Sequence, residues 1–307
     1  MYYFIVNEHG GSGRTKRTWQ KVQKLMDASG EQYKSFSTDS ETAATEIARK
    51  LTENAAEDIR IIVVGGDGSI NGVLCGIQDF SKVSFGLIPS GSGNDFARGM
   101  GIPHNTRKAV QQILSAGDGK LVDIGCVEKS GAALRFFGIS AGIGMDAIVC
   151  KLASVSRLKA VLNHLGLGKF IYVILTVRTL FSMKKEKVSV QFDDNEAVNF
   201  DGLIFLATMN LRAEGGGVPM CPDAVPTDGK LSVCIASGIS KLRAFLLFPK
   251  LIMGKHAGSK GFFLQDCTSV TIKTQNPMAF HTDGEYCGDV QAICIKCLKE
   301  KLRLLSC

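Results

Sequence analysis

The sequence predicts an α/β domain followed by a mainly β domain. Apolar strands alternate with amphipathic helices as far as Leu121, whereas short strands dominate the remainder. The length of 307 residues suits about two domains, each with its own core. Because 45% of the residues are hydrophobic, a disordered chain is excluded. We expect domains at residues 1–121 and 122–307, with the last segment able to pack back on the first domain.

Strands and helices alternate regularly in the first domain. One expected helix places Trp19, Val22 and Met26 on a single face and stops at Gly30. The expected strands are short apolar runs, and 59–64 is continuously apolar, as at the centre of a parallel sheet. The expected strands are 2–6, 33–37, 59–64 and 85–88, and the expected helices are 15–29, 40–55, 70–78 and 106–115. This alternation predicts a doubly wound sheet.

The second half is dominated by short strands, which favours a mainly β domain. Two helical stretches, about 157–183 and 241–253, interrupt the strands. The expected strands are 119–127, 134–139, 187–192, 202–209, 230–235, 261–264, 269–273 and 290–298.

Three glycine-rich turns follow strands of the first domain. They are NEHGGSGR (7–14), VVGGDGSING (63–72) and IPSGSGNDFAR (88–98). Glycine permits positive φ angles and a close approach of the backbone, so N–H groups and helix N-termini can face phosphates. Because the carboxyl ends of parallel strands share one edge, the turns should meet there. On its own, a GGDG turn could also be an ordinary tight turn.

Carboxylates in two turns are candidates for metal binding and proton transfer. Asp67 would repel a phosphate unless Mg²⁺ lay between them, which favours a metal–nucleotide ligand. In FHTDGEY, Asp283 and Glu285 flank Gly284 in a predicted turn between strands. Such a pair can supply a general base, although Asp-Gly is also an ordinary hairpin turn. We favour Asp283 slightly over Glu285, because Gly284 should leave its carboxylate open.

Two phosphate-binding patterns do not apply. The sequence contains no GxxxxGK[ST] motif, which excludes a Walker-type loop. GIGMDA (142–147) fits GxGxxG/A after a strand, but no acidic residue occurs between Asp146 and Glu186. A Rossmann dinucleotide site there would lack its ribose-binding partner.

The net charge of +7 is unevenly distributed. Lys151–Lys187 holds eight basic residues and one acidic residue, and Lys241–Lys260 holds five basic residues and no acidic one. Both stretches are also rich in large apolar residues, which favours an anionic membrane surface over nucleic acid. Two solvated helix faces are an equal alternative from charge alone. Without a secretory signal or a spanning segment, we expect a cytoplasmic protein in peripheral contact with the membrane.

Taken together, these motifs resemble the diacylglycerol kinase catalytic family, particularly soluble bacterial lipid kinases. NEHGGSGR resembles the family's NPxSGxG, GGDGSIN resembles GGDGTxN, PSGSGNDFAR resembles PxGTxNDFAR, and the DGE at residues 283–285 is the family's late DGE. The likeness covers nearly the whole chain in the same motif order. It implies a phosphofructokinase-like α/β domain, a β-sandwich domain and MgATP as cofactor.

The resemblance also implies roles for individual residues. Nucleotide binding falls to the glycine turns and to Thr38, and a structural Mg²⁺ site uses the Asp228 carboxylate with the carbonyls of Val225 and Lys230. The catalytic candidates are Asp283, Glu285 and Asp67. The nucleotide candidates are Asn7, Gly10, Gly11, Thr38, Gly65, Gly66, Asp67, Gly68, Ser69, Ile70, Asn71, Gly72, Ser92 and Asn94. Departures from the family pattern are Glu8 for Pro, Ser69 and Ser92 for Thr, and Gly72 for Glu.

The expected activity is transfer of the ATP γ-phosphoryl group to a lipid hydroxyl, with diacylglycerol as the first choice. A sphingoid-base or ceramide-type lipid kinase and an NAD kinase are the enzymatic alternatives, and a TPTGSTAY-like stretch typical of the latter is absent. A catalytically silent lipid- or nucleotide-sensing module is the alternative outside enzymes. The expected partner is a lipid at an anionic membrane surface, without nucleic acid, and homodimerisation is left open.

Overall fold

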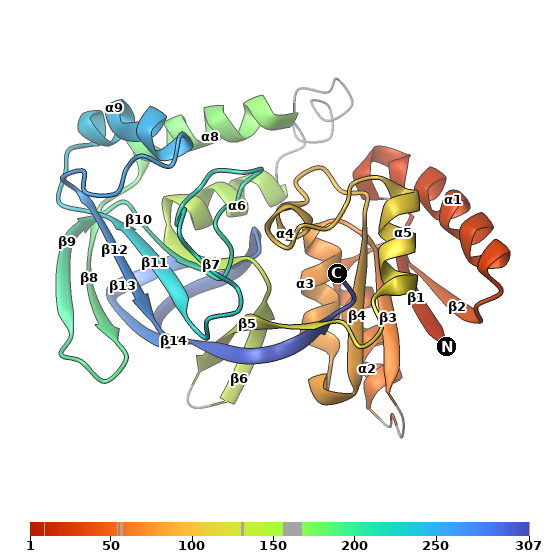
Figure 1. The fold of residues 1–307 in the computed structure, drawn as a ribbon. Helices are drawn as coiled ribbons and strands as arrows, with labels where there is room; N and C mark the ends of the chain where they lie inside the picture. The colour runs from red at the N-terminus through yellow and green to blue at the C-terminus, as the bar shows by residue number, and fades with distance from the viewer. Residues whose placement is uncertain (9, 54, 56–57, 130–131, 156–167, 307) are drawn as a thin grey trace. The chain divides into compact units, whose positions relative to one another are not determined.

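A computed structural model describes residues 1–307 apart from 9, 54, 56–57, 130–131, 156–167 and 307. The chain forms two compact units, each described by itself below (Figure 1). The first comprises Met1–Ile124 together with Lys299–Cys307, and the second comprises Gly125–Leu298. The chain therefore returns to its first unit at the C-terminus, where Arg303 and Leu304 pair in parallel with Ser84 and Phe85.

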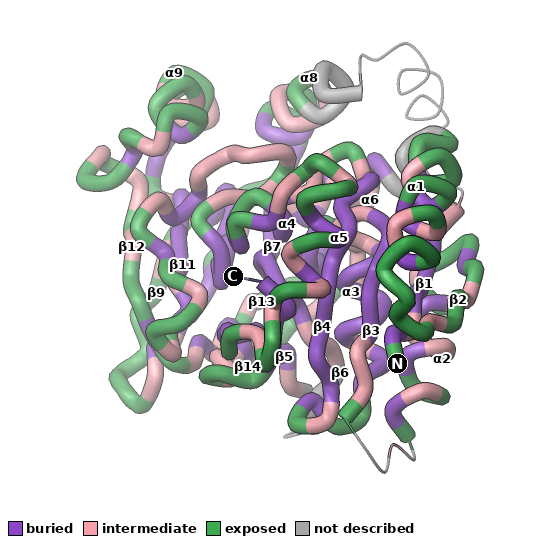
Figure 2. The backbone as a smooth tube through the Cα atoms, turned by 45° about the vertical axis from the view of Figure 1, so that its right-hand side comes forward, coloured by how far each residue is buried: buried purple, intermediate pink, exposed green. Residues whose placement is uncertain are grey.

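The first unit contains a parallel sheet with the order β4-β3-β1-β2. Its strands are β1 (Tyr2–Asn7), β2 (Tyr33–Thr38), β3 (Ile59–Gly65) and β4 (Val83–Pro89). Figure 2 shows β3 and β4 buried along most of their lengths, as expected of central strands covered on both faces. The prediction of a doubly wound α/β domain is confirmed.

Helices cover both faces of this sheet (Figure 1). Trp19, Val22 and Met26 of α1 and Ile113 of α5 pack in one core cluster against Phe4 and neighbouring strand residues. Helices α2 and α3 pack against each other on the opposite face. The helices are α1 (Arg14–Ser29), α2 (Glu41–Thr52), α3 (Asp67–Gly76), α4 (Asp95–Gly99) and α5 (Thr106–Ser115), with short 3-10 turns at Gly10–Gly13 and Phe80–Lys82.

The second unit contains two packed antiparallel layers. One has the order β12-β11-β10-β7, and the other is built on β13 and β14 with β8, β9, β5 and β6. Inward-facing residues of both layers form one buried cluster, with Ile143 and Val233 from the first and Val190, Ile272 and Ile295 from the second. The predicted β-sandwich is thereby confirmed. The strands are β5 (Lys120–Lys129), β6 (Ala132–Phe137), β7 (Ser140–Gly144), β8 (Glu186–Phe192), β9 (Val198–Leu203), β10 (Phe205–Met209), β11 (Leu231–Ala236), β12 (Phe262–Cys267), β13 (Ser269–Thr282) and β14 (Glu285–Leu304).

Strand β13 joins the two layers. Its first part, Val270–Thr274, pairs with β8, and its end, Phe280–Thr282, pairs with β7. Irregular pairing with β14 between Lys273 and Met278 marks the bend. The strand therefore places its C-terminal residues beside the start of β7, where a tight turn leads into β14.

Several predicted boundaries were wrong. Helix α3 begins at Asp67 rather than residue 70, because Gly66 is its N-cap and the glycine turn forms the first helical turn. The sequence also predicted neither β7 nor the helix α6 (Met145–Val155), which together contain GIGMDA. Of the helix expected at 157–183, residues 156–167 lie outside the described residues, and α8 spans Gly168–Ser182. Helix α9 spans Lys241–Ile252.

Membrane-spanning helices are absent from the part of the chain that the structure describes, because none of its helices combines the necessary length and apolarity.

Close packing of α2 on α3 leads to a test of the fold. A Cβ atom at Gly76 would lie 2.3 Å from the carbonyl oxygen of Thr45. Alanine normally favours a helix over glycine by about 1 kcal/mol. We nevertheless expect Gly76→Ala to lower the free energy of unfolding by about 1–3 kcal/mol, since overpacking outweighs propensity.

Urea denaturation measures this loss, with Gln111→Ala at an exposed position of α5 as the control. A Gly76→Ala protein as stable as the parent would show that α2 and α3 are not in such close contact.

Candidate active site

Three loops of the first unit lie at one edge of its sheet. The turns after β1, β3 and β4 all follow the carboxyl ends of neighbouring parallel strands. Asn7 Nδ2 lies 3.3 Å from Ser69 Oγ, which joins the first turn to the second. Thr15 and Ser90 hydroxyls lie 2.8 Å apart and join the first turn to the third. Side chains from distant segments therefore hold the three turns together.

Glycine is required where the second and third turns touch. A Cβ atom at Gly66 would lie 3.0 Å from the Cα atom of Gly91, and one at Gly91 would lie 2.5 Å from the Cα atom of Gly66. Ser90 also donates its backbone N–H to the carbonyl of Gly65. The two turns thus pack backbone against backbone, with no room for a side chain between them.

The carboxylate of Asp67 binds the main chain of the third turn. Oδ2 accepts the N–H of Asp95 at 3.1 Å and Oδ1 accepts the N–H of Phe96 at 3.2 Å. These N–H groups belong to the first two residues of the short helix α4, and a negative charge is favourable at the N-terminus of a helix. Asp67 therefore has a structural function in addition to any interaction with a cation.

The remaining nucleotide candidates differ in their exposure. Gly10 and Gly11 lie in the first turn. Gly68, in the first turn of α3, is partly exposed, and so is Asn94 in the third glycine turn, where Ser92 is exposed. By contrast, Thr38, Ile70, Asn71 and Gly72 are buried. A Cβ atom at Gly72 would lie 2.7 Å from the carbonyl oxygen of Glu41, so this glycine allows α3 to pack on α2. Its packing explains why the glutamate of the family pattern could not be accommodated here.

In the second unit, the DGE segment forms a two-residue hairpin turn. Thr282 of β13 pairs with Glu285 of β14, and the φ angles of Asp283 and Gly284 are 49° and 84°. Two positive φ angles match the type I′ turn that Asp-Gly favours. The predicted turn between strands is therefore present, and Glu285 is half-buried at the start of β14.

Asp283 does not have the open carboxylate that the sequence led us to expect. Its Oδ2 accepts the N–H of Gly138 at 2.9 Å, and Oδ1 accepts those of Ile139 and Ser140 at 2.7 and 3.0 Å. The residue is only 8% exposed, and its own N–H donates to the carbonyl of Ser140. Gly284 shapes the turn, but the turn directs the Asp283 carboxylate inward to the β6–β7 connection.

The predicted Mg²⁺ site lies in an exposed turn before β11. Asp228 and Val225 are exposed, and Asp228 Oδ1 accepts the backbone N–H of Lys230 at 2.9 Å. A carboxylate and backbone carbonyls are oxygen donors of the kind that Mg²⁺ binds. The residues fit the ion in chemical type, with one carboxylate oxygen already engaged in the turn.

Sequence reasoning missed four polar residues in or near these turns, namely Asp95, Asp146, Glu214 and His281. Asp95 is 6% exposed and forms an ion pair with Arg98. In the second unit, donor atoms of Asp146, Glu214 and His281 lie within 4.8 Å of one another. Asp146 had been considered only within the rejected GIGMDA pattern, whereas His281 stands two residues before Asp283 and could have been noticed.

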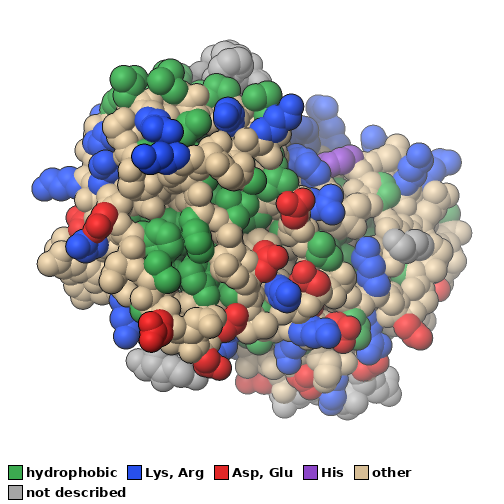
Figure 3. Space-filling view, turned by 60° about the vertical axis from the view of Figure 1, so that its left-hand side comes forward, with side chains coloured by type: hydrophobic (Ala, Val, Ile, Leu, Met, Phe, Trp, Pro, Cys, Tyr) green, Lys and Arg blue, Asp and Glu red, His purple; other side chains and the backbone are tan. Residues whose placement is uncertain are grey.

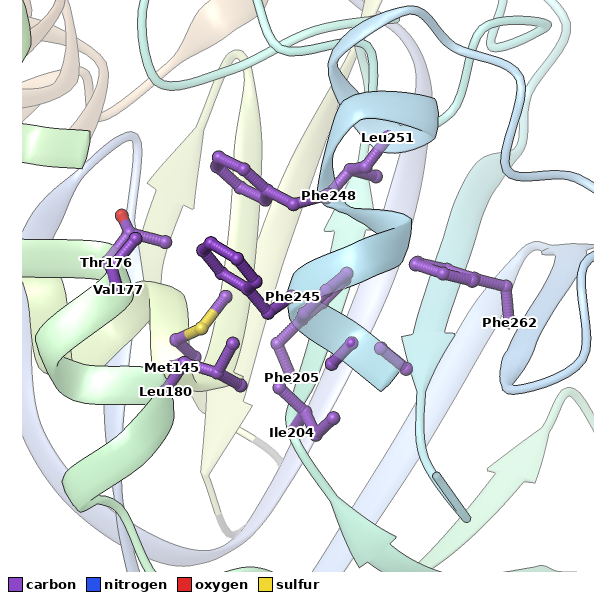
Figure 4. Close-up of a pocket in the computed structure, with 12 residues that line it drawn as sticks. Met145, Thr176, Val177, Leu180, Ile204, Phe205, Phe245, Phe248, Leu251 and Phe262 are labelled. Atoms are coloured by element: carbon purple, nitrogen blue, oxygen red, sulfur yellow. The ribbon is translucent and has the colours of Figure 1, made fainter. Parts of the chain in front are cut away.

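Apolar side chains line a small cavity beneath α8 and α9. Figure 4 shows Phe245 and Phe248 of α9 pointing toward α8, which contributes Val177 and Leu180. The floor is formed by Phe205 and other residues of the sheet, and the free volume is about 20 Å³. Because roughly 10–15 Å³ of such space holds one water molecule, the cavity has room for about one water, and a larger apolar ligand could enter only if the helices moved.

The anchoring of Asp283 leads to a stability prediction. Asp283→Asn replaces one accepting oxygen by an NH₂ group, which then faces backbone N–H donors. Leaving buried donors unpaired costs about 1–3 kcal/mol, so we expect a loss of at least that size in the free energy of unfolding.

Denaturant titration of the variant measures the effect, and Glu285→Gln is the matched control because it keeps the turn. Equal stability of the two variants would contradict the anchoring role of Asp283.

Two family models together match almost the whole chain. The model described as "Diacylglycerol kinase catalytic domain" matches residues 1–127. The model described as "YegS C-terminal NAD kinase beta sandwich-like domain" matches residues 139–306. The order of the two matches agrees with the order of the two units.

Similar sequences include proteins named diacylglycerol kinase. One from Staphylococcus saprophyticus is 28% identical over 286 residues, which covers 92% of this chain and 88% of that protein. One from Mycobacterium tuberculosis is 30% identical over 196 residues, with 64% and 60% covered.

A solved structure of a diacylglycerol kinase from Bacillus anthracis has a TM-score of 0.71 at 18% identity, covering 100% of this chain and 96% of that one. The structure therefore supports the fold, and the two family models support the activity class. The chain belongs to the diacylglycerol kinase catalytic-domain family and is a phosphotransferase with an alcohol acceptor.

Proposed function

We propose that the chain transfers the γ-phosphoryl group of ATP to the hydroxyl of a membrane lipid, with diacylglycerol as the acceptor and phosphatidic acid as the product. The observation that carries the proposal is the joining of three glycine turns at one sheet edge through Asp67, Thr15 and Asn7. Relatives named diacylglycerol kinase support this choice of acceptor.

In this proposal, the glycine turns bind the triphosphate. Backbone N–H groups of the turns and the N-terminus of α3 provide donors for phosphate oxygens. Asp67 would hold Mg²⁺ beside the phosphates, and the turn ending in Asp228 would hold a second, structural Mg²⁺. Bound Mg²⁺ supplies neutralisation of phosphate charge. Phosphoryl transfer depends mainly on such positioning and charge stabilisation.

Glu285 is our choice for the general base. Asp283 is occupied by three N–H donors, whereas Glu285 is the half-buried carboxylate next to it in the same hairpin. The Glu285 carboxylate would take the proton of the lipid hydroxyl while the oxygen of that hydroxyl forms a bond to the γ-phosphorus. The bond from that phosphorus to the bridging oxygen breaks, and ADP leaves with the electron pair.

The apolar cavity of the second unit is suited to an acyl chain. Its lining contains phenylalanine, leucine and methionine side chains, and Thr176 is its one polar member. Phe181 of α8 and Phe245 of α9 are both partly exposed, and their ring centroids are 6.0 Å apart. We propose that α8 and α9 separate to admit an acyl chain to this apolar layer.

The same helices carry the proposed membrane-binding surface. Leu246, Ile252 and Met253 are 67%, 49% and 58% exposed. Lys250 and Lys255 are exposed beside them. Figure 3 shows hydrophobic side chains together with Lys and Arg side chains at this end of the unit. Apolar residues combined with basic residues favour an anionic bilayer.

A transfer assay tests the proposal. Purified protein, [γ-³²P]ATP and Mg²⁺ are incubated with mixed micelles of diacylglycerol, and labelled phosphatidic acid is quantified. We expect turnover with diacylglycerol and much less with monoacylglycerol, phosphatidylglycerol, sphingosine or NAD⁺. Preferential labelling of another lipid would change the acceptor, and labelling of NAD⁺ alone would overturn the lipid kinase assignment.

Replacement of the proposed base should slow the phosphoryl-transfer step without weakening the binding of ATP. Loss of a general base costs roughly 10²–10⁴-fold in rate. Glu285→Gln should therefore lower kcat by that order and leave the KM for ATP unchanged, because the nucleotide residues belong to the first unit. Glu196→Gln, at an exposed turn of the same unit, is the matched control. A kcat close to that of the parent would exclude Glu285 as the base.

Charge reversal should weaken membrane binding. Each basic residue near an anionic surface is worth about 1 kcal/mol, so replacing Lys250, Lys255 and Lys260 by Glu should reduce partitioning onto phosphatidylglycerol vesicles by roughly 100-fold or more. Vesicle sedimentation at low salt measures this.

The control replaces the exposed residues Lys21, Lys24 and Lys34 of the first unit by Glu. Equal losses in both triple variants would mean that net charge, rather than this surface, governs binding.

A further inference from the structure

The hairpin that carries Glu285 has a second anchor besides Asp283. The imidazole of His281 lies beside the turn, with Nδ1 3.3 Å from the backbone N–H of Gly284, which donates to it. Its Nε2 lies 3.2 Å from Oδ2 of Asp146. The side chain is only 2% exposed. One ring thus connects the turn on one side to helix α6 on the other.

The surroundings of His281 are built to hold this arrangement. Asp146 lies in the first turn of α6, and its Oδ1 accepts the N–H of Ala147 at 2.8 Å. Gly142 faces the pair across the β7–β13 ladder. A Cβ atom at Gly142 would lie 2.5 Å from Asp146 Oδ2 and 3.0 Å from His281 Nε2. The contact between Asp146 and His281 therefore requires glycine at this position of GIGMDA.

Glu214 extends the network to the anchor of Asp283. Its carboxylate accepts a hydrogen bond from the hydroxyl of Ser140, whose backbone N–H donates to Asp283. Burial favours the neutral form of His281, but the hydrogen bond and charge of Asp146, with the charges of Glu214 and Asp283, raise its pKa above the ordinary value. The Gly284 N–H instead favours the neutral ring, because a ring protonated on both nitrogens cannot accept its hydrogen bond. The observed contact with Gly284 therefore belongs to the neutral form of His281.

A metal ion is the alternative occupant of this cluster. One imidazole nitrogen and two carboxylates could ligate a divalent transition metal. A metal-bound histidine, however, normally donates its other N–H to an acceptor. Here Nδ1 faces a donor, so the remaining proton of the neutral ring must be on Nε2, which then donates to Asp146. A ring protonated on both nitrogens also lacks a free Nε2 lone pair.

We propose that His281 is a positioning residue for the reaction, which holds the Asp283–Gly284 turn so that the Glu285 carboxylate is aimed at the acceptor hydroxyl. This inference rests on the proposed function. His281 does not touch the reacting atoms but acts through the main chain of Gly284. A misplacement of about 1 Å in a catalytic group can cost on the order of 10²-fold in rate.

Two replacements of His281 separate positioning from packing. An Asn side chain can place its amide oxygen near the position of Nδ1 and accept the Gly284 N–H, whereas Ala leaves it unpaired. In an assay at a pH above the raised pKa of His281, where Nδ1 can accept, we expect His281→Ala to lower kcat by about 10- to 100-fold with the KM for ATP unchanged, and His281→Asn to recover much of that loss. His256→Asn, at another fully buried histidine of the same unit, is the control for destabilisation alone.

Equal kcat values for His281→Ala and the parent would overturn the proposal. The proposal would also be overturned if His281→Asn lowered kcat as much as His281→Ala. A loss of kcat in His256→Asn equal to that in His281→Ala would overturn it as well.

A measurement on the parent protein decides the geometry even where a variant fails to fold or the lipid assay shows no turnover. At a pH above the raised pKa of the His281 ring, its ¹⁵N NMR shifts should show a proton on Nε2, with Nδ1 unprotonated and hydrogen-bonded. A failed lipid assay with this signature would count against the proposed function, but not against the anchoring of the turn. A ring bound through Nε2 to Zn²⁺ or Mn²⁺, with one ion per chain by elemental analysis and none in His281→Ala, would replace the proposal by a metal site.

Discussion

The interaction on which the proposed active site depends is the hydrogen bond between a carboxylate and main-chain N–H groups. Asp67 binds the N–H groups of Asp95 and Phe96, and Asp283 binds three such groups that begin at Gly138. In each case the bond joins segments far apart in the sequence and fixes a turn that carries residues of the proposed active site. An ionised acceptor makes these bonds stronger than neutral ones, and burial makes their loss costly.

The same interaction divides the roles of neighbouring acidic residues. In the DGE turn, Asp283 stabilises the backbone, which leaves Glu285 as the candidate for proton transfer. His281 and Asp146 form a further link to the same turn through Gly284. The glycine turns of the first unit are fixed in a comparable way, with Gly66 packed on Gly91 and Asp67 holding the next helix. A few polar side chains thus maintain the main-chain geometry of the turns in each unit.

Much of the fold could be predicted from local patterns. Alternating apolar strands and helices indicated the first sheet, and the three glycine turns were correctly expected to meet at one of its edges. The environment of a side chain was harder to predict. Asp283 was expected to be open because glycine follows it, but its partners at 138–140 are distant in the sequence. GIGMDA was set aside as a nucleotide motif, yet its Gly142 and Asp146 meet His281 through strand pairing that no local pattern contains.

Amide hydrogen exchange of the parent protein tests most directly whether carboxylates hold these turns. The account predicts that the N–H groups of Gly138, Ile139, Ser140, Asp95 and Phe96 exchange as slowly as those of the central strands, because they open only when their units unfold. Exchange of these five amides at rates typical of exposed loops would contradict it, since N–H groups held in hydrogen bonds to carboxylates cannot also be freely accessible to water.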